Sequence, residues 1–289
     1  MPTTYTPRHT RLAHPPRMRL TERDVAVVLA VYEYRVLRRD QIQRMFFTGK
    51  NTANERLKRL YQHGYLDRRW LPVAYGEGSS QALYLLAERG AQLVAASVGV
   101  DRAAIDWKDA HNRVRSPFLE HLLMTNEVRL ALTLAARRHG YAVERWLDEE
   151  TLKAHAEGVN VTREDGTARH VPLVPDGYFS LDLGDRRAHF FLEIDRATEA
   201  NRRWADKVRA YQRYAHSGRY AARYQARSLR VLTVTTGRKR LDNLKRTTER
   251  AGGDAMFWFA SVGDVAPSKA LVQPVWHVAG QERPNPLIS

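Results

Sequence analysis

The segment FFLEIDRATE, residues 190–199, constrains the fold most, because an apolar run leads directly into two carboxylates. Alternation along AHFFLEID places Glu193 and Asp195 on one strand face with His189 and Phe191, and only apolar side chains on the other face. The preceding segment VPDGYFSLDL also alternates and is separated from it by a Gly-Asp turn, so the two predict a β-hairpin. We therefore expect a buried sheet with acidic side chains at a strand end.

Asp176, on the first strand of this hairpin, shares its face with Tyr178 and Ser180. If the hairpin pairs so that Asp176 lies beside Glu193 or Asp195, three carboxylates converge. Carboxylates that close repel one another unless something neutralises them, and Mg²⁺ prefers oxygen ligands. The sequence therefore predicts a site for Mg²⁺ or Mn²⁺ at these three residues.

The predicted helix over residues 200–216 brings a cation toward the same place. Trp204, Lys207, Val208 and Tyr211 follow helical spacing on one face. Because Lys207 points with the apolar residues toward the sheet, it needs a partner, and the acidic cluster is the nearest candidate in sequence.

A purely structural interpretation stays open for the same acids. Glu193 and Asp195 would then form a salt-bridge cluster with nearby arginines, namely Arg196, Arg202 or Arg203. The run from Arg202 to Arg227 contains eight basic residues and one acid. That excess of positive charge favours contact with phosphates over a merely solvated helix face.

The remaining pattern of the second half predicts an α/β (α+β) domain over residues 118–289. A long helix and a strand come first, at residues 118–139 and 141–147, and residues 154–170 form a loop or an irregular hairpin. After the central hairpin and helix we expect a strand, a helix and a strand at residues 228–236, 238–250 and 255–261. Because strands and helices intermix in this order, the sheet should be mixed, with flanking helices.

The first hundred residues predict a basic arm and a winged helix-turn-helix. Residues 1–20 hold four prolines and form the arm. Thr21 caps the first of three helices, the others covering residues 38–47 and 51–63. The chain continues with a strand at residues 65–73, the loop YGEGSS, a second strand at residues 80–87 and a closing helix at residues 88–97. The domain therefore spans residues 21–100, and the polar residues 101–117 form a linker.

The third helix of this domain should enter the major groove of double-stranded DNA. Its apolar face carries Ala53, Leu57, Leu60 and Tyr61, and Asn54, Glu55 and Gln62 belong to the polar face. Asn, Arg and Lys side chains read base edges and phosphates. The predicted DNA contacts are Asn51, Thr52, Arg56, Lys58 and Arg59 on the helix, and Arg68 and Arg69 at the wing. A winged helix that binds only protein is the alternative, but the polar helix face favours DNA.

Composition agrees with a nucleic-acid partner. The 289 residues carry a net charge of +15, and proteins this basic usually meet nucleic acid. The absence of cysteine excludes disulfides and thiolate metal sites. The N-terminus lacks the apolar region of a secretory signal, and no apolar run is long enough to cross a membrane. We expect a cytoplasmic protein with no membrane partner.

The motif PDGYFSL…FFLEIDRATE…KVRAY resembles the core of PD-(D/E)XK nucleases. The resemblance implies that Asp176 and Glu193 bind Mg²⁺ and that a lysine orients the attacking water. Asp195 stands where the family lysine normally stands, and Lys207 could be a lysine that has migrated onto the next helix, as in some members. Tyr211 resembles the tyrosine of a helical motif in the RecB-like branch. Glu120 resembles an acid that some members supply from their first helix.

The whole of residues 20–216 is similar to the replication-relaxation family of plasmids and integrative elements. This resemblance implies a DNA-binding protein of a mobile element, involved in replication or relaxation, and, if active, a metal-dependent DNA endonuclease or nickase. The alternative is a non-catalytic transcriptional regulator or relaxosome accessory factor with a degenerate nuclease fold. Other replication or relaxase proteins, and a second copy of the chain, are further partners that the sequence leaves open.

Overall fold

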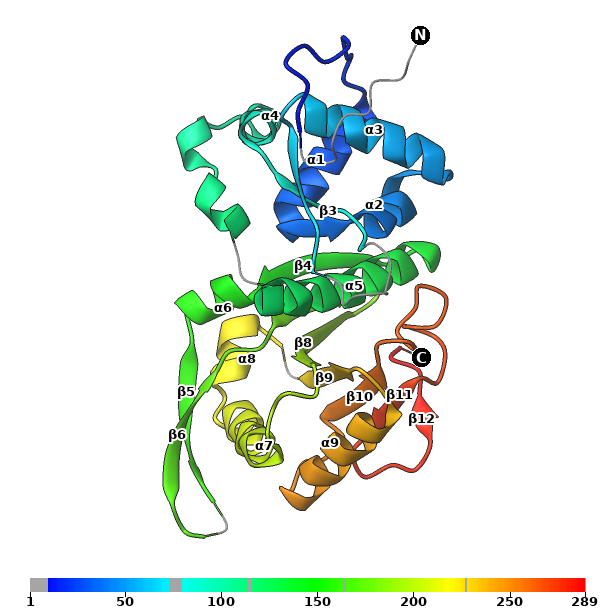
Figure 1. Ribbon diagram of the computed structural model, residues 1–289. Coiled ribbons are helices and arrows are strands. Elements are labelled where there is room, and N and C mark those ends of the chain that lie inside the picture. The colour runs from blue at the N-terminus through cyan, green and yellow to red at the C-terminus, as the bar shows by residue number, and fades with distance from the viewer. Residues whose placement is uncertain (1–9, 73–79, 114–115, 164, 227, 289) are drawn as a thin grey trace. The chain divides into compact units, whose positions relative to one another are not determined.

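The computed structural model describes residues 10–72, 80–113, 116–163, 165–226 and 228–288 (Figure 1). The chain divides into two compact units, Met1–Asn126 and Glu127–Ser289. The division falls inside one long helix, α5 (Ser116–Arg138).

The first unit consists of short helices and a small sheet. Its elements are α1 (Glu22–Tyr34), β1 (Val36–Arg38), α2 (Arg39–Phe46), α3 (Lys50–Gln62), β2 (Leu66–Arg69), β3 (Leu83–Leu86), α4 (Glu88–Val98) and the 3-10 helices η1 (Arg102–Ala104) and η2 (Asp109–Arg113). The three predicted helices, the two predicted strands and the closing helix are present in the predicted order. Strand β1 was missed because three residues are too few to show a period. Assignment to the winged helix-turn-helix class stays a prediction, and residues 75–79 of the YGEGSS loop lie outside the described residues.

Helix α1 begins at the residue that the sequence predicts, because a side chain caps its first turn. The Thr21 hydroxyl accepts a hydrogen bond from the Asp24 backbone N–H, and the Asp24 carboxylate accepts one from the Thr21 backbone. This reciprocal capping satisfies two N–H groups that a helix start would leave unpaired. Val27, Val28 and Val31 then face the core of the unit, where they are fully buried.

The small sheet has the strand order β1–β3–β2, and both pairings are antiparallel. Leu83 and Leu85 of β3 pack with Leu119 and Leu123 from the start of α5. Tyr84 and Leu86 belong to the core formed with α1, α3 and α4. Because the side chains of β3 alternate, the strand separates two apolar clusters.

The segment predicted as a linker, residues 101–117, packs against the first unit over much of its length. Ile105 and Trp107 are buried in the core of that unit. The Asn112 side chain donates a 2.8 Å hydrogen bond to the Leu86 carbonyl. The polar composition of the segment concealed these anchors, because two apolar side chains among many polar ones give no period.

The second unit is built around a seven-stranded mixed sheet. After α5 come β4 (Ala142–Asp148), α6 (Glu149–Ala154), β5 (Glu157–Thr162), β6 (Ala168–Leu173), β7 (Gly177–Asp182), β8 (Arg187–Asp195), α7 (Asn201–His216), α8 (Arg219–Tyr224), β9 (Arg230–Thr235), α9 (Arg238–Arg250), β10 (Phe257–Ser261), β11 (Trp276–Val278) and β12 (Pro284–Asn285). The strand order is β12–β11–β10–β9–β8–β7–β4. Together the two units confirm the predicted α+β class.

The centre of the sheet follows the prediction closely. Strands β7 and β8 form the antiparallel hairpin, with Tyr178 opposite Phe191. Strands β8, β9 and β10 run parallel to one another, because α7, α8 and α9 return the chain between them. The acids at the end of β8 therefore lie at the carboxyl ends of parallel strands.

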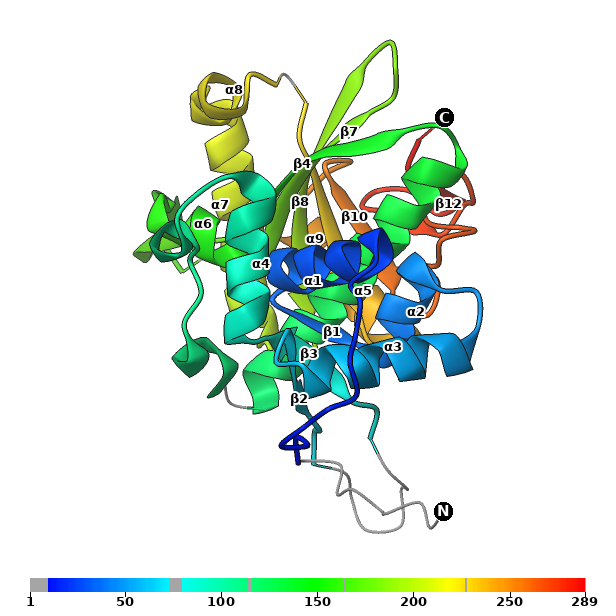
Figure 2. The same ribbon diagram turned by 90° about the horizontal axis from the view of Figure 1, so that it is seen from above.

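Both faces of the sheet are covered. Helices α7 and α9 lie side by side on one face (Figure 1 and Figure 2), where Trp204 and Tyr211 pack with Phe191 and Phe259. On the other face the Phe179 ring stacks on Phe190, and α5 packs nearby in Figure 1. Alternate residues of β8 thus enter two separate cores.

Residues 154–170 belong to a hairpin, as one of the two predicted alternatives has it, but the hairpin is regular. Strands β5 and β6 form an antiparallel ribbon with Val159 opposite Val171, and residue 164 lies outside the described residues. The inner face of the ribbon is buried with α7, and this packing orders a segment whose glycine and charge content suggested irregularity. Within the described residues, no helix is long and apolar enough to span a bilayer.

Candidate functional site

The exposed face of α3 presents the predicted DNA contacts that remain unengaged. Asn51, Thr52 and Lys58 are exposed, whereas the apolar face of the helix is buried. Within the described part of the chain, the side chains of these three residues and of Asn54 make no hydrogen bond or ion pair. Arg59 is exposed as well and pairs with Glu55 one turn earlier at 2.9 Å, an ion pair that is weak in water.

Arg56 was predicted to contact DNA, but the fold uses it elsewhere. Its guanidinium forms a two-pronged ion pair with Asp24 of α1, whose side chain is fully buried. Although burial acts to raise it, the pKa of Asp24 lies below its usual range because of these bonds. Gln62, placed on the exposed polar face, is also buried, and it bonds the backbone of Thr10 and Leu12.

The two wing arginines are half-buried and make contacts within the first unit. The Arg68 guanidinium lies 3.7 Å from the centre of the Tyr61 ring. Arg69 donates a 2.6 Å hydrogen bond to the Asn112 carbonyl. Both contacts join the sheet to its neighbours, so these side chains have a structural role whether or not they also contact phosphates.

The hairpin brings Asp176 and Glu193 together at the ends of β7 and β8. The register pairs Gly177 with Leu192, so Asp176 comes beside Glu193 as the chain continues. One Asp176 carboxylate oxygen accepts a 2.6 Å hydrogen bond from the Ile194 backbone N–H. The predicted convergence of these two acids is therefore confirmed.

Glu193 forms the centre of a buried polar cluster with Lys207 and Tyr211. Glu193 is 4% exposed, and both of its carboxylate oxygens accept hydrogen bonds. Lys207 Nζ donates to Oε2 at 2.8 Å, and the Tyr211 hydroxyl donates to Oε1. The predicted contact of Lys207 with the acids is confirmed; Glu199 lies 3.8 Å away on its other side.

Burial dominates the electrostatics of this cluster. Desolvation raises the pKa of Glu193 to about 7, with Lys207 acting to lower it and the charge of Asp176 adding to the rise. Burial likewise opposes the charge of Lys207, but Glu193 raises the pKa of that ammonium above its ordinary value. Burial and the neighbouring carboxylate raise the pKa of the Tyr211 hydroxyl as well.

Asp195 does not join the predicted trio of metal ligands. Arg240 of α9 donates to both of its carboxylate oxygens, at 2.8 and 2.7 Å. The Thr235 hydroxyl and the Ala197 backbone N–H bond it as well. Although burial acts to raise it, these partners hold the pKa of Asp195 below its usual range. The structural alternative is thus correct for Asp195, but with Arg240 in place of the arginines near it in sequence.

The sequence missed Glu149, the first residue of α6. Its carboxylate and that of Asp176 have oxygens within 4.8 Å of one another, a separation at which two carboxylates can share a cation. The sequence signal that could have indicated Glu149 is its position at the start of a helix directly after the end of a strand. Glu120, the other predicted acid, is exposed on α5 in the first unit.

An oxygen-rich site at Glu193 also includes Thr233 of β9. The two residues are paired in register, so their side chains share a face of the sheet. The Thr233 hydroxyl oxygen is buried, and no hydrogen-bond partner for it is found among the described residues. A water carried by a cation would satisfy this hydroxyl, and Asp176 offers carboxylate oxygen, the ligand type of Mg²⁺ and Mn²⁺, beside Glu193 on one side and near Glu149 on the other.

Much of the basic run Arg202–Arg227 binds the β5–β6 ribbon. Asp206, its one acid, is buried and pairs with Arg163. Arg223 donates to the His155 carbonyl, just before β5, at 2.8 Å, and Arg213 and Arg219 donate to carbonyls of β5. Residue 227 itself lies outside the described residues. Several arginines of the run therefore bond the ribbon as well, and contact of the run with phosphates stays a prediction.

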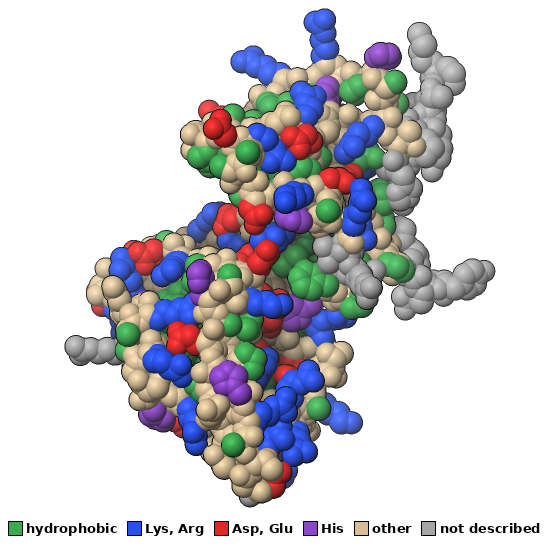
Figure 3. All heavy atoms as spheres, turned by 90° about the vertical axis from the view of Figure 1, so that its left-hand side faces the viewer, with side chains coloured by type: hydrophobic (Ala, Val, Ile, Leu, Met, Phe, Trp, Pro, Cys, Tyr) green, Lys and Arg blue, Asp and Glu red, His purple; other side chains and the backbone are tan. Residues whose placement is uncertain are grey.

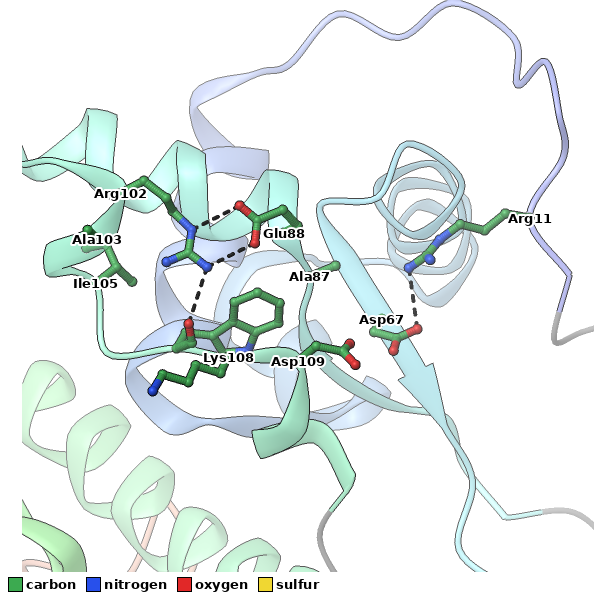
Figure 4. Close-up of a pocket in the computed structure, with 10 residues that line it drawn as sticks. Arg11, Asp67, Ala87, Glu88, Arg102, Ala103, Ile105, Lys108 and Asp109 are labelled. Atoms are coloured by element: carbon green, nitrogen blue, oxygen red, sulfur yellow. Dashed lines mark hydrogen bonds and ion pairs between the residues drawn. The ribbon is translucent and has the colours of Figure 1, made fainter.

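A pocket of about 660 Å³ lies in the first unit, and none of the predicted DNA contacts lines it (Figure 4). Most of its charged side chains are paired: Arg102 bonds both oxygens of Glu88, Arg11 bonds Asp67 at 3.4 Å, and Asp109 pairs with Arg113. Because most of these charges are neutralised in pairs, the pocket is not favoured as the functional site.

Comparison with known proteins gives a family and a likeness to a solved structure. A family model described as Replication-relaxation matches residues 29–229, more than half of the chain. No curated protein matches the sequence. The solved structure of restriction endonuclease FokI aligns with a TM-score of 0.31 and 11% identity, over 84% of this chain. The chain spans 43% of the length of that structure.

Proposed function

The chain belongs to the replication-relaxation family, and we propose that it binds double-stranded DNA of a plasmid or integrative element during replication or relaxation. The observation that carries the proposal is the exposed face of α3, where Asn51, Thr52 and Lys58 have no partner among the described side chains. The net charge of +15 supports the same partner. A cytoplasmic site of action, relaxase or other replication proteins as partners, and a homodimer are parts of this proposal.

The contacts proposed for α3 differ in kind. An α-helix fits the major groove, where an asparagine amide can read an adenine edge. Lysine is a point charge that neutralises a phosphate and is blind to sequence. Asn51 would therefore set sequence preference, while Lys58 and Arg59 would set affinity.

The test compares Lys58→Ala and Asn51→Ala in the full chain on a panel of duplexes. Lys58→Ala should weaken binding to every duplex and reduce the log–log salt slope by about 0.9. Asn51→Ala should change the ranking of the duplexes. Absence of duplex binding at low salt by the wild-type protein would sink the proposal.

A second candidate function, a metal-dependent DNA nuclease, is favoured by the acids around Asp176. Glu149, Asp176 and Glu193 would hold Mg²⁺ or Mn²⁺, which supplies polarisation of a phosphoryl oxygen and a water of lowered pKa. Tyr211 orients Glu193 by bonding Oε1. Lys207 holds a positive charge at Oε2 and can turn toward a bound phosphate or the attacking water.

Cleavage has its own test. Wild type should nick or degrade DNA only with Mg²⁺ or Mn²⁺, and Asp176→Asn and Glu193→Gln should each abolish cleavage. Asp185→Asn is the control, because it removes an exposed carboxylate in the turn before β8. Metal-independent or absent cleavage on supercoiled, duplex and single-stranded DNA would leave a non-catalytic regulator or accessory factor.

A further inference from the structure

A basic groove of about 570 Å³ lies in the second unit, between the β5–β6 ribbon and the C-terminal end of α7. We call it the β5–α7 groove, and its polar lining residues are Asn160, His170, Arg213, His216, Ser217 and Arg219. None of the described residues that line it is acidic. A concave surface with two arginines, two histidines and no carboxylate suits an anion.

Two backbone carbonyls of β5 hold the arginines of the groove in place. Arg213 donates to the Asn160 carbonyl at 2.8 Å, and Arg219 donates to the Gly158 carbonyl at 3.3 Å. A guanidinium has five N–H groups, so each arginine keeps donors for a ligand after making these bonds. Glu157 lies 3.5 Å from Arg219 but is itself shared with Arg223.

His170 of β6 is also held in place by its neighbours. Its ring lies so close to Gly158 that a β-carbon there would come within 2.1 Å of His170 Nε2. The other ring nitrogen, Nδ1, is 3.0 Å from the Asn160 side-chain oxygen. The ribbon therefore uses a glycine to bring an imidazole against the groove, where a larger residue would push it away.

A structural role explains only part of this arrangement. Basic residues at a helix C-terminus stabilise its dipole, and arginines that bond β5 protect an open strand edge. His216, however, is exposed, and no side-chain bond is recorded for it within the described residues. Arg169 and Arg202, which are exposed and pair with Asp206 and Asp165, lie on the same ribbon and helix, and basic side chains gather on this face of the second unit (Figure 3).

We propose that the β5–α7 groove binds the phosphodiester backbone of double-stranded DNA, as a sequence-independent contact separate from the α3 contact. This inference rests on the proposed function, since it takes DNA as the ligand. Two fixed guanidiniums on one rim and an imidazole on the other match an oxyanion that presents several acceptor oxygens.

The experiment is His216→Glu in the full chain, with His139→Glu as the matched control. Both histidines are exposed, and each lies at the end of a helix of the second unit, so neither change should unfold the protein. His216→Glu should weaken duplex binding at least about tenfold at low salt, because it places a carboxylate where a phosphate would bind, and Arg219→Gln should reduce the salt slope by about 0.9, the value for one phosphate. His139→Glu should leave both unchanged.

Separate outcomes identify which proposal fails. Equal losses for His216→Glu and His139→Glu would overturn the groove, and Arg219→Gln with an unchanged slope would do the same. An effect of His216→Glu without any effect of Lys58→Ala would support the groove and overturn the α3 contact. Thermal stabilisation of wild type by inorganic phosphate, lost in His216→Glu while DNA binding persists unchanged, would assign the groove to a free anion and refute the DNA contact.

Discussion

Replacing Lys207 by methionine tests how the buried carboxylate is stabilised. Methionine keeps an unbranched side chain but removes the ammonium that lies 2.8 Å from Glu193 Oε2. Glu193 would remain 4% exposed beside Asp176, with only the Tyr211 hydroxyl still donating to it. The variant therefore leaves a buried charge without its counterion.

The expected cost follows from this burial. Breaking a buried ion pair by removing one partner costs about 3–5 kcal/mol. Because the Lys207 side chain keeps 26% of its exposure to water, we expect the lower end, about 3 kcal/mol at pH 8.

The pKa of Glu193 is raised to about 7 in the wild-type protein, and without Lys207 it should rise further. A raised folded-state pKa means that stability is present at low pH and is lost as pH rises through that value. The loss should therefore be smaller at pH 5, where Glu193 takes up a proton.

The assay is urea-dependent hydrogen exchange of β8 and β9 peptides at pH 5 and pH 8, which reports on the second unit alone. Lys245→Met is the matched control, since Lys245 pairs with Glu249 at 2.6 Å but Glu249 is 33% exposed. The control should cost no more than about 1 kcal/mol at either pH. A loss for Lys207→Met that is equal at both pH values, or no larger than the control, would refute the reasoning.

Three further predictions concern the first unit. Arg56→Ala should lower the free energy of unfolding of the first unit by about 3 kcal/mol, because it leaves the buried Asp24 without its counterion. Arg59→Ala should cost under about 1 kcal/mol, and equal losses for the two variants in urea unfolding would contradict this. Because the pKa of Asp24 is lowered by folding, its contribution is present near neutral pH and lost as pH falls below about 4, so Asp24→Asn should flatten the acid limb of a stability–pH curve. Gly90→Ala places a β-carbon 2.1 Å from the Tyr65 carbonyl oxygen and should cost about 3 kcal/mol, whereas Gly49→Ala, whose nearest neighbour is 3.8 Å away, should leave the melting temperature nearly unchanged.

The sequence by itself determined the elements and the faces of the central hairpin. Periodicity of two along AHFFLEID placed Phe191 and Glu193 on one face, and the structure packs that face against α7. Helical spacing placed Lys207 and Tyr211 toward the sheet, and both contact Glu193. These predictions succeed because side-chain direction in a strand or helix is a local property of the backbone.

Only the tertiary structure decided which charges meet. Asp195 pairs with Arg240, 45 residues away, and Arg56 pairs with Asp24, 32 residues away. Glu149 approaches Asp176 because α6 begins where β4 ends beside β7. A chain this rich in arginine offers many partners for every buried acid, and spacing along the sequence does not rank them. The partner is selected by which guanidinium or ammonium the packed helices bring within hydrogen-bonding distance, since a buried carboxylate left without one would destabilise the fold.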